Sequence, residues 1–347
     1  MDVRLSPEQQ ALRDSAIQIV DRLGPQAVGQ LDDLERADKL HAAVSASGWR
    51  ELRVSEAGGQ PLASAVEVAI VAEELGRGLA DAPFLGPTLA AELRRLAGAS
   101  PATAPETVAL SLPMSELARS AAGDAPAGAV AVDARGALSA LVLVPTPDGP
   151  VLATVSLRSP EVRTDLTRPA AAVDEASAVA PIGQPAGPLA VDDLSAWTAM
   201  GLALTSADLV GTMGGAIDLT VAYAASRRQY GRPIGSFQAV QHLLADAFVL
   251  MEGSRSIARH AAWAVDALPT DEALAAAAGA KAYCARAART VCETSIQVHG
   301  GIGNTWECLA HVFLRRTLVS SAVLGGEGAS LERVLVHHGI GGSNGLQ

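Results

Sequence analysis

The chain has 347 residues, of which 49% are hydrophobic and 3% aromatic, and its formal net charge is -11. This length predicts two packed domains or one large one, and abundant alanine with few aromatics favours closely packed helices. The acidic balance and the lack of a Lys/Arg run argue against nucleic acid as a partner. No signal-peptide core and no stretch of eighteen uninterrupted apolar residues occurs, so we expect no membrane insertion and a cytoplasmic protein.

Residues 1–100 carry helix signals. Ser6, Pro7 and Gln9 have the pattern of an N-cap, a first-turn proline and a capping-box partner, and apolar residues then recur at helical spacing to Val20. Similar signals predict three more helices, at about 40–47, 64–75 and 87–96. A turn is predicted at 57–59. We therefore expect an N-terminal helical domain.

Residues 101–190 change in character, because proline, glycine and short β-branched runs replace the helical period. Four of these runs are bounded by turn residues, as short strands are. They cover 108–112, 129–132, 141–144 and 151–155. The segment 101–190 is a predicted small β-domain.

From residue 191 to the end the helical signature returns. Long alanine-rich stretches cover 195–226, 236–267 and 270–299. The predicted fold is therefore mainly α, with 191–347 as a C-terminal bundle of long helices that forms the oligomer interface.

The three cysteines lack the Cys-x-x-Cys spacing of a structural zinc site. Free cysteine is among the residue types most often buried. We expect Cys284, Cys292 and Cys308 to be reduced and structural, and we expect no metal site.

Two motifs in the C-terminal part carry a resemblance to a known family. Residues 226–238 have the sequence SRRQYGRPIGSFQ, and residues 297–303 have the sequence QVHGGIG. In this order, and about sixty residues apart, they resemble the signatures of acyl-CoA dehydrogenases. The segments 47–49 and 73–77 also fit that family's helical domain. The resemblance implies the acyl-CoA dehydrogenase fold over nearly the whole chain, most weakly over 101–190.

The first motif also has a physical interpretation. A helix that ends at Ser226-Arg227-Arg228 places two guanidinium groups just before Tyr230-Gly231, where the chain must turn. The guanidinium fork matches the geometry of a pyrophosphate, so the segment suits the anionic centre of a dinucleotide. The other interpretation is a solvated helix end.

The resemblance assigns roles in FAD binding across a subunit interface to residues of the first motif. It implies that Arg227 contacts the pyrophosphate and that Gln229 hydrogen-bonds nearby. Tyr230 would lie beside the adenine, and Gln238 would donate an amide contact.

The second motif is assigned to the same FAD arm. The resemblance implies that Gln297, Gly300 and Gly301 contact its adenosine and ribityl region, and the two glycines allow close approach of backbone N–H groups. We interpret His299 as a helix-end histidine that donates to a carbonyl.

The reaction of this family needs a carboxylate that removes the α-proton while the β-hydride passes to the flavin. By resemblance the candidate base is Glu327, in a loop after the last signature helix, at a spacing a few residues longer than usual. An alternative position in some members matches Gly201, and the arginine that neighbours it is replaced by Leu202. We expect Glu307 to be structural. Glu327 is either a working base or an ordinary loop carboxylate.

The predicted β-domain departs furthest from the family. The Glu-Pro-x-x-Gly-Ser-Asp turn and the Thr/Ser-rich strand that cover the flavin ring do not occur in 101–190, where 113–116 resemble the turn only faintly. Residues 165–169, Asp-Leu-Thr-Arg-Pro, resemble a sequence in shortened actinobacterial members. The chain is thus similar to the partly degenerate subunits of heteromeric, steroid side-chain-type enzymes.

The resemblance implies an α2β2 hetero-oligomer with a second acyl-CoA dehydrogenase subunit that carries the base. Its substrate would be an acyl-CoA, its cofactor FAD and its next electron carrier an electron-transfer flavoprotein. One alternative is a self-sufficient homo-oligomer with Glu327 as base, and another is a flavin-free structural subunit. Arg227 and Gln297 count against the last, because packing requires neither a cation nor an amide there.

Overall fold

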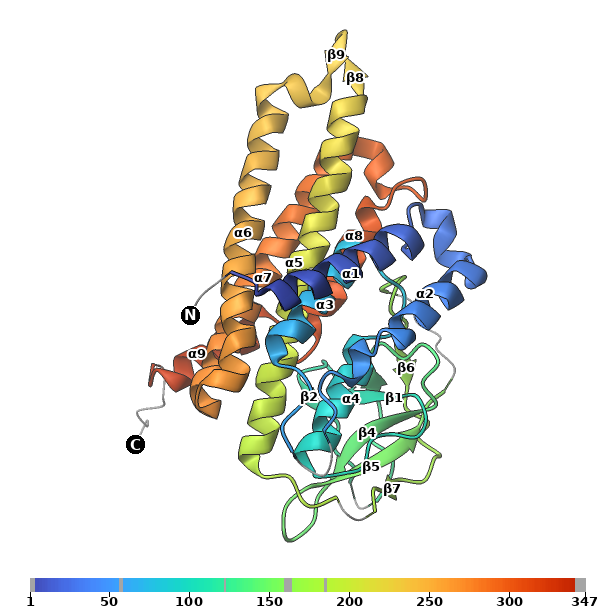
Figure 1. Cartoon of the computed structure of the whole chain (residues 1–347), viewed down its shortest axis with the longest axis vertical. Coiled ribbons are helices and arrows are strands. Elements are labelled where there is room, and N and C mark those ends of the chain that lie inside the picture. The colour runs from blue at the N-terminus through green and yellow to red at the C-terminus, as the bar shows by residue number, and fades with distance from the viewer. Residues whose placement is uncertain (1–3, 56–58, 122, 159–163, 184–185, 341–347) are drawn as a thin grey trace.

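The computed structural model describes residues 4–55, 59–121, 123–158, 164–183 and 186–340, so most of the turn expected at 57–59 lies outside the described residues. The fold is mainly helical. Its long C-terminal helices run side by side along the long axis of the molecule, and a small sheet lies beside one end of them (Figure 1).

The N-terminal helices form as predicted, with one correction. They are α1 (Pro7–Leu23), α2 (Leu34–Ala46), α3 (Ala65–Arg77) and α4 (Leu85–Leu96). The capping box of α1 is confirmed, because Gln9 N donates to Ser6 Oγ at 3.2 Å and Ser6 N donates to Gln9 Oε1 at 3.0 Å. The second helix begins earlier than the predicted residue 40, because Asp33 is its N-cap and accepts from Arg36 N.

The sheet contains all four predicted strands together with three short ones. The strands are β1 (Glu106–Ser111), β2 (Glu116–Leu117), β3 (Val130–Ala131), β4 (Ser139–Val144), β5 (Val151–Ser156), β6 (Ala171–Ala172) and β7 (Ala180–Pro181). Their order is β6-β3-β1-β4-β5-β7, with β2 paired to β1. The β1–β4 pair is parallel, with Val108 opposite Leu141, and the other named pairs are antiparallel.

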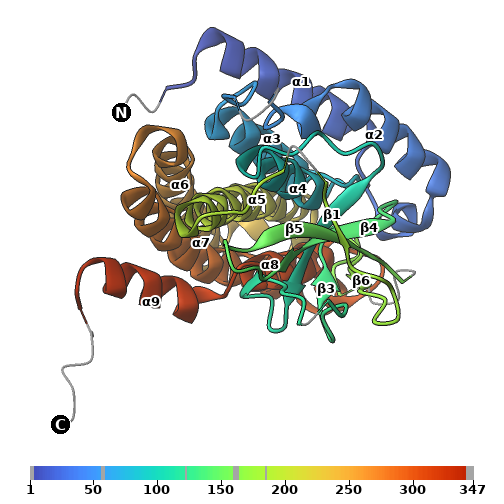
Figure 2. The same cartoon turned by 90° about the horizontal axis from the view of Figure 1, so that it is seen from below.

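The three long C-terminal helices are confirmed. The C-terminal elements are α5 (Val191–Ser226), α6 (Gln238–Ala267), α7 (Thr270–His299), α8 (Ala310–Ala322) and α9 (Glu327–His337). By length and composition α5 could cross a membrane, but 94% of its most apolar stretch is buried inside the protein. Figure 2 shows α5 between α3 and α4 on one side and α6, α7 and α8 on the others.

Small residues let the central helix approach its neighbours closely. A Cβ on Gly211 of α5 would lie 1.7 Å from the carbonyl oxygen of Glu73 on α3, so only glycine fits there. Trp197 of α5 is buried and donates from Nε1 to the carbonyl of Leu89 at 3.0 Å. Helix α5 therefore joins the N-terminal helices to the bundle.

The three cysteines are free and buried, as expected. Burial raises the pKa of Cys284 to about 12 and that of Cys292 to about 12. Both thiols are therefore protonated and unreactive near neutral pH.

Candidate functional site

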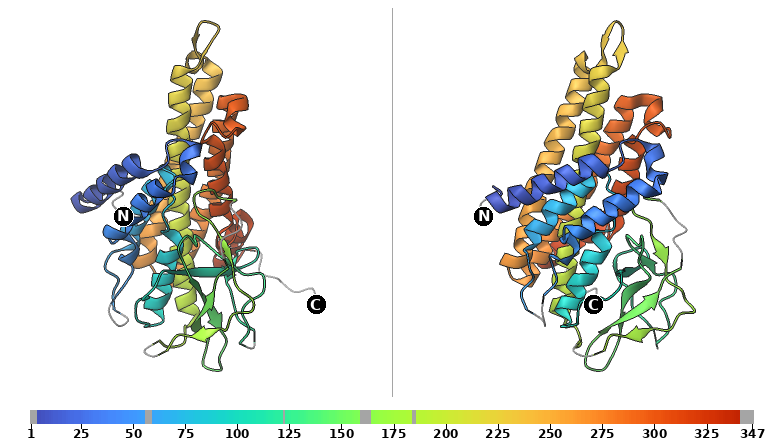
Figure 3. Two further views of the ribbon diagram at one scale, coloured as in Figure 1. Left: turned by 90° about the vertical axis from the view of Figure 1, so that its right-hand side faces the viewer. Right: turned by 45° about the vertical axis from the view of Figure 1, so that its right-hand side comes forward.

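Residues 227–237, here called the arginine hairpin, project from the far end of α5 and α6. Helix α5 ends at Ser226 because Arg227 takes an extended conformation, with φ -69° and ψ 125°. Strands β8 (Arg228–Gln229) and β9 (Arg232–Pro233) then pair across a two-residue turn. The turn residues Tyr230 and Gly231 have φ angles of 52° and 78°, as a hairpin of type I′ requires. Figure 3 shows the hairpin extending beyond the other helices of the bundle.

The hairpin carries three guanidinium groups that have no carboxylate partner among the described residues. Arg227 makes no side-chain hydrogen bond or ion pair with any residue that the structure describes, and Arg228 donates only to the carbonyl of Gly231, at 3.4 Å. The guanidinium carbon of Arg232 lies 4.2 Å from the centre of the Phe237 ring. Three exposed cations at one tip of an acidic chain form a local positive field suited to an anion.

An aromatic ring and two amides accompany these cations. Tyr230 is 94% exposed and contacts Phe237 edge-on, with ring centroids 6.2 Å apart. Gln229 is exposed, and its Nε2 donates to the carbonyl of Arg228 at 2.9 Å. Gln238 is the exposed first residue of α6, where the helix dipole and free backbone N–H groups favour an anion.

The second motif lies at the C-terminal end of α7. Gln297 is exposed in the last turn, and Gly300 ends the helix with φ 67° and ψ -144°, a conformation open essentially to glycine alone. Gly301 is exposed and follows in η4 (Gly300–Asn304), and a Cβ there would meet no atom within 4 Å. The backbone of 300–301 is therefore open to a ligand.

A residue that the sequence did not single out connects the two motifs. Tyr223 of α5 stacks on His299 of α7, with ring centroids 4.4 Å apart and planes inclined by 24°. The Nδ1 atom of His299 lies 2.8 Å from the carbonyl of Ser295, which confirms the expected helix-end interaction. Tyr223 is four residues before Arg227, so this stack fixes the base of the arginine hairpin to the end of α7.

The predicted FAD-binding residues thus gather at one end of the bundle. Arg227, Gln229, Tyr230, Gln238, Gln297, Gly300 and Gly301 are all exposed. None of them lines the cavities described around the sheet and the N-terminal helices. Their roles in FAD binding stay predictions, and their exposure leaves one side of the site for another molecule to close.

Glu327 does not join this group. It is the first residue of α9 and not a loop residue, because the helix begins directly after Gly326 and its N-terminus favours a carboxylate. Its Oε1 lies 2.8 Å from Arg286 Nη2 of α7, and its side chain is 37% exposed. Gln297 is eleven positions after Arg286 along α7, which is about 16 Å of helix.

A buried ionic network, missed by the sequence reasoning, joins the sheet region to the bundle. Arg168 Nε lies 3.0 Å from Asp165, and its Nη1 lies 3.3 Å from Asp208 of α5. Arg316 of α8 binds the same Asp208 at 2.6 Å, and Ser320 Oγ donates to it at 2.6 Å. The segment 165–169, noted for its resemblance, is thereby anchored to α5 and α8.

The network has matched charges, and its pKa shifts follow from that match. Burial alone would raise the pKa of Asp208, but Arg168 and Arg316 overcome this and hold the pKa below its ordinary value. Lys281 of α7 is buried close by and donates to Thr205 Oγ1 at 2.9 Å. Burial lowers the pKa of Lys281 to about 7.

The interior at this junction is almost filled, with an apolar cavity beside it. The space bordered by Phe84, Arg168, Asp208 and Arg316 amounts to about 10 Å³. A neighbouring cavity of about 300 Å³ is lined by Leu112, Met114, Val130, Ala171 and Val319 among others. Residues 113–116, the faint match to the family's flavin-covering turn, thus lie beside this cavity.

Comparisons with known proteins agree with this architecture. The sequence profile of the acyl-CoA dehydrogenase C-terminal domain matches residues 198–336. The acyl-CoA dehydrogenase IpdE2 of Mycobacterium tuberculosis is 33% identical over 325 residues, which cover 91% of this chain and 93% of that protein.

Two solved structures share the fold. A variant of the steroid ACAD Tcur3481-Tcur3483 has a TM-score of 0.79 at 24% identity, covering 96% of this chain and 98% of the other. The ChsE4-ChsE5 complex from Mycobacterium tuberculosis has a TM-score of 0.77 at 23% identity, covering 99% and 100%. Because both identities are below 25%, these two similarities show the fold alone.

Proposed function

The chain belongs to the acyl-CoA dehydrogenase family, and we propose that it is one subunit of a heteromeric enzyme, to which it supplies the ADP-binding side of the FAD site. The observation that carries this proposal is the exposure of the arginine hairpin. Its cations, aromatic ring and amides project from the tip of two helices and line no described cavity. Such groups suit a ligand that a second subunit encloses from the other side.

The residues present fit FAD chemically. Arg227 and Arg228 carry planar donor groups for a pyrophosphate, and Tyr230 offers an exposed ring face to an adenine. Gln297 and the open backbone of 300–301 provide donors and close approach for the ribose and ribityl hydroxyls. When bound, FAD supplies the hydride acceptor for α,β-dehydrogenation of an acyl-CoA thioester.

We assign the catalytic base to the partner subunit. A general base must be close to the proton it removes and free to accept it. Glu327 is instead paired with Arg286 of α7, with 2.8 Å between Oε1 and Nη2, so its carboxylate is engaged by a cation and is not free to accept a proton. The self-sufficient homo-oligomer with Glu327 as base is the second candidate, supported by the apolar cavity beside Met114 that could border a flavin ring.

The proposed partner is a second acyl-CoA dehydrogenase subunit in an α2β2 assembly. Two structural neighbours support this, because one is the steroid ACAD Tcur3481-Tcur3483 and the other is the ChsE4-ChsE5 complex, each with two named components. On that likeness we propose a bulky, steroid-type acyl-CoA as substrate, an electron-transfer flavoprotein as the next carrier and a cytoplasmic location. A flavin-free structural subunit would have no use for three exposed arginines at its tip that lack a carboxylate partner among the described residues.

The test is to purify the chain alone and together with an acyl-CoA dehydrogenase encoded beside its gene. Flavin absorbance, oligomer mass and dehydrogenation of an acyl-CoA are measured for both preparations. The proposal predicts a lone chain without flavin and a yellow, active pair. A lone chain that is yellow, turns over an acyl-CoA and is inactivated by Glu327→Gln would instead establish the homo-oligomer.

A further inference from the structure

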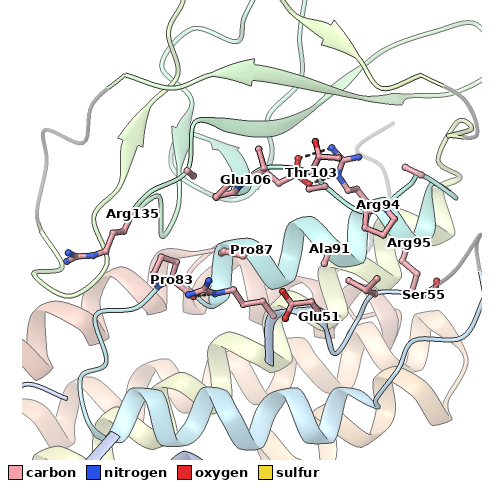
Figure 4. A pocket seen from close by; sticks show the side chains of 18 of the residues that line it. Glu51, Ser55, Pro83, Pro87, Ala91, Arg94, Arg95, Thr103, Glu106 and Arg135 are labelled. Carbon is pink, nitrogen blue, oxygen red and sulfur yellow. Dashed lines mark hydrogen bonds and ion pairs between the residues drawn. The ribbon is translucent and has the colours of Figure 1, made fainter. Parts of the chain in front are cut away.

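Another cavity lies at the opposite end of the molecule from the arginine hairpin, where the N-terminal helices meet the sheet. It measures about 340 Å³ and lies between η2 (Trp49–Glu51), the outer face of α4 and the segment before β1. Figure 4 shows Pro87, Ala91 and Arg94 of α4 facing Thr103 on the other wall. Pockets for small ligands begin at roughly 300 Å³, and no predicted FAD-binding residue lines this one.

The cavity gathers positive charge in a chain whose net charge is -11. Its charged lining residues are Arg50, Arg94, Arg95, Arg135, Glu51 and Glu106, with His41 beside them. Two of these arginines are already neutralised. Arg94 forms a two-pronged ion pair with Glu106, and Arg95 Nη2 lies 2.8 Å from Glu92 Oε1.

Arg50 has no carboxylate partner among the described residues. It donates to the carbonyl of Pro83 at 2.6 Å and to Ser45 Oγ at 2.9 Å, which are uncharged acceptors. Its remaining nitrogen, Nη2, is buried without a hydrogen-bond partner in the described part of the chain. Burial also lowers the pKa of Arg50, although Asp133 and Glu51 oppose this.

Arg135 is similarly unmatched. The carboxylate oxygen closest to it, on Asp81, is 4.0 Å from Arg135 Nη2. Asp81 already accepts hydrogen bonds from both Nη atoms of Arg36. The Nε atom of Arg135 and the Oγ atom of Ser55, another lining residue, are buried with no partner within the described ranges. Unsatisfied buried donors are costly, so these two arginines hold positive charge beside the cavity without a full set of partners.

The other walls are apolar and stiff. They are formed largely by prolines and alanines, among them Pro83, Pro87, Ala91, Pro101 and Pro105. Proline has a fixed φ and these side chains carry no rotamer freedom, so the cavity is preformed. A ligand that matches both the arginine-lined side and the apolar walls of the cavity has one anionic group and an apolar body.

We propose that this cavity binds a small organic anion, a carboxylate or phosphate monoester on an apolar body. The anionic group lies on the side of the cavity that Arg50 and Arg135 line, and the apolar body contacts the prolines and Ala91 of α4. The site is separate from the FAD-binding residues, so the inference stands or falls independently of the proposed function.

His41 gives the site a spectroscopic signal. Burial lowers the pKa of His41, and the charges of Arg50 and Arg135 lower it further, against opposing effects of Asp38 and Asp133. An anion bound at the two arginines offsets their charge. The pKa of His41 therefore rises when the ligand binds.

The experiment is isothermal titration calorimetry on the full chain, or on the purified pair if the chain is soluble only with its partner. The probes are octanoate, phenyl phosphate, inorganic phosphate and the neutral octanamide. We expect octanoate or phenyl phosphate to bind, octanamide not to bind and inorganic phosphate to bind more weakly. The stronger of the two organic anions identifies the preferred head group.

Arg135→Met should weaken binding at least about tenfold, because a charge-assisted interaction is lost. Arg289→Met, at an exposed arginine of α7 paired with Glu293, is the matched control and should leave binding unchanged. Ala91→Leu fills the apolar part while keeping every arginine, and it should also abolish binding. In NMR titrations the His41 resonance, assigned with His41→Asn, should shift to a higher pKa with the anion.

Three results would overturn the proposal. One is equal binding of octanamide and octanoate, which would remove the anionic recognition. Another is wild-type affinity in both Arg135→Met and Ala91→Leu, which would place the binding elsewhere. The third is no binding of any probe at millimolar concentration.

Discussion

The arginine hairpin and the buried ionic network use the same side chain in opposite ways. At the hairpin, Arg227 and Arg228 are exposed and have no carboxylate within ion-pair distance among the described residues. In the network, Arg168 and Arg316 are buried and share Asp208. An exposed guanidinium remains hydrated until a ligand arrives, whereas a buried one must be matched within the fold. The hairpin arginines are therefore available to bind a ligand, whereas the network arginines stabilise the fold.

The largest expected effect is in the network. Asp208→Asn removes the carboxylate that Arg168, Arg316 and Ser320 share and leaves two buried guanidinium groups with too little negative charge. We expect the free energy of unfolding to fall by about 3–5 kcal/mol, measured by urea denaturation. The exposed carboxylate variant Glu293→Gln is the control and should keep the wild-type midpoint. A loss in Asp208→Asn no larger than in this control would contradict the role of the network.

At the hairpin the effect should be on ligand affinity and not on folding. Arg227→Ala should weaken FAD binding by the pair about tenfold to a hundredfold, because a hydrogen-bonded charge contact is lost. The urea midpoint of the lone chain should not change, since Arg227 has no side-chain partner among the described residues. FAD titration of the apo pair by fluorescence measures the FAD affinity, and Arg289→Ala is the matched exposed control. Equal FAD affinity in the two variants would exclude Arg227 from the site.

Lys281, beside the network, should make stability depend on pH. Its folded pKa of about 7 lies below its ordinary value of 10.5, so from pH 7 upward the unfolded chain holds a proton that the folded chain has released. Stability should therefore rise with pH, by up to about 1.4 kcal/mol per unit. Lys281→Met removes this slope, and unfolding at pH 7.0, 7.7 and 8.4 measures it.

The pH range of this measurement, 7.0 to about 8.4, stays below the ordinary pKa of a thiol. Above it Cys284 and Cys292, whose folded pKa values are about 12, oppose the trend, because the folded chain then keeps protons that the unfolded chain has lost. Parallel pH profiles for Lys281→Met and the wild type would contradict a neutral buried lysine.

The two glycines at the end of α7 should separate folding from binding. Gly300→Ala forces a side chain into φ 67° and ψ -144° and should destabilise the chain by about 1–3 kcal/mol. Gly301→Ala meets no neighbouring atom, so it should leave stability unchanged and weaken FAD binding by the pair. Thermal unfolding and FAD titration of both variants measure these effects. Unchanged FAD affinity in Gly301→Ala would remove this residue from the site.

The smallest effect is expected for Glu327→Gln. If the partner carries the base, acyl-CoA dehydrogenation by the pair should stay within about twofold of the wild type, because a factor of two is only about 0.4 kcal/mol in activation free energy. Steady-state turnover of the pair is the measurement. A loss of a hundredfold or more, with FAD still bound, would make Glu327 the base.

Local patterns in the sequence predicted much of the fold. The capping box at Ser6, the alanine-rich helical periods and the turn at Tyr230-Gly231 depend on neighbours in the chain, and the structure confirms each of them. The candidate FAD residues came from their motifs, and the structure brings them to one end of the bundle. Their exposure could not be predicted, because the sequence does not say which side of a site a second chain completes.

The missed features depend on contacts between distant segments. Asp208 and Arg316 are 108 residues apart, and no local spacing indicates that one carboxylate will neutralise two arginines. The Tyr223–His299 stack likewise joins two helices. The early start of α2 is a local feature, because Asp33 is an N-cap residue in the sequence even though the apolar periodicity begins only near residue 40.

The most direct test of the central claim is the structure of the co-purified pair with FAD bound. The account predicts that the guanidinium of Arg227 lies within hydrogen-bond distance of the FAD pyrophosphate, with the isoalloxazine ring held mainly by the partner subunit. FAD bound wholly within one chain, with the arginine hairpin in solvent, would contradict it.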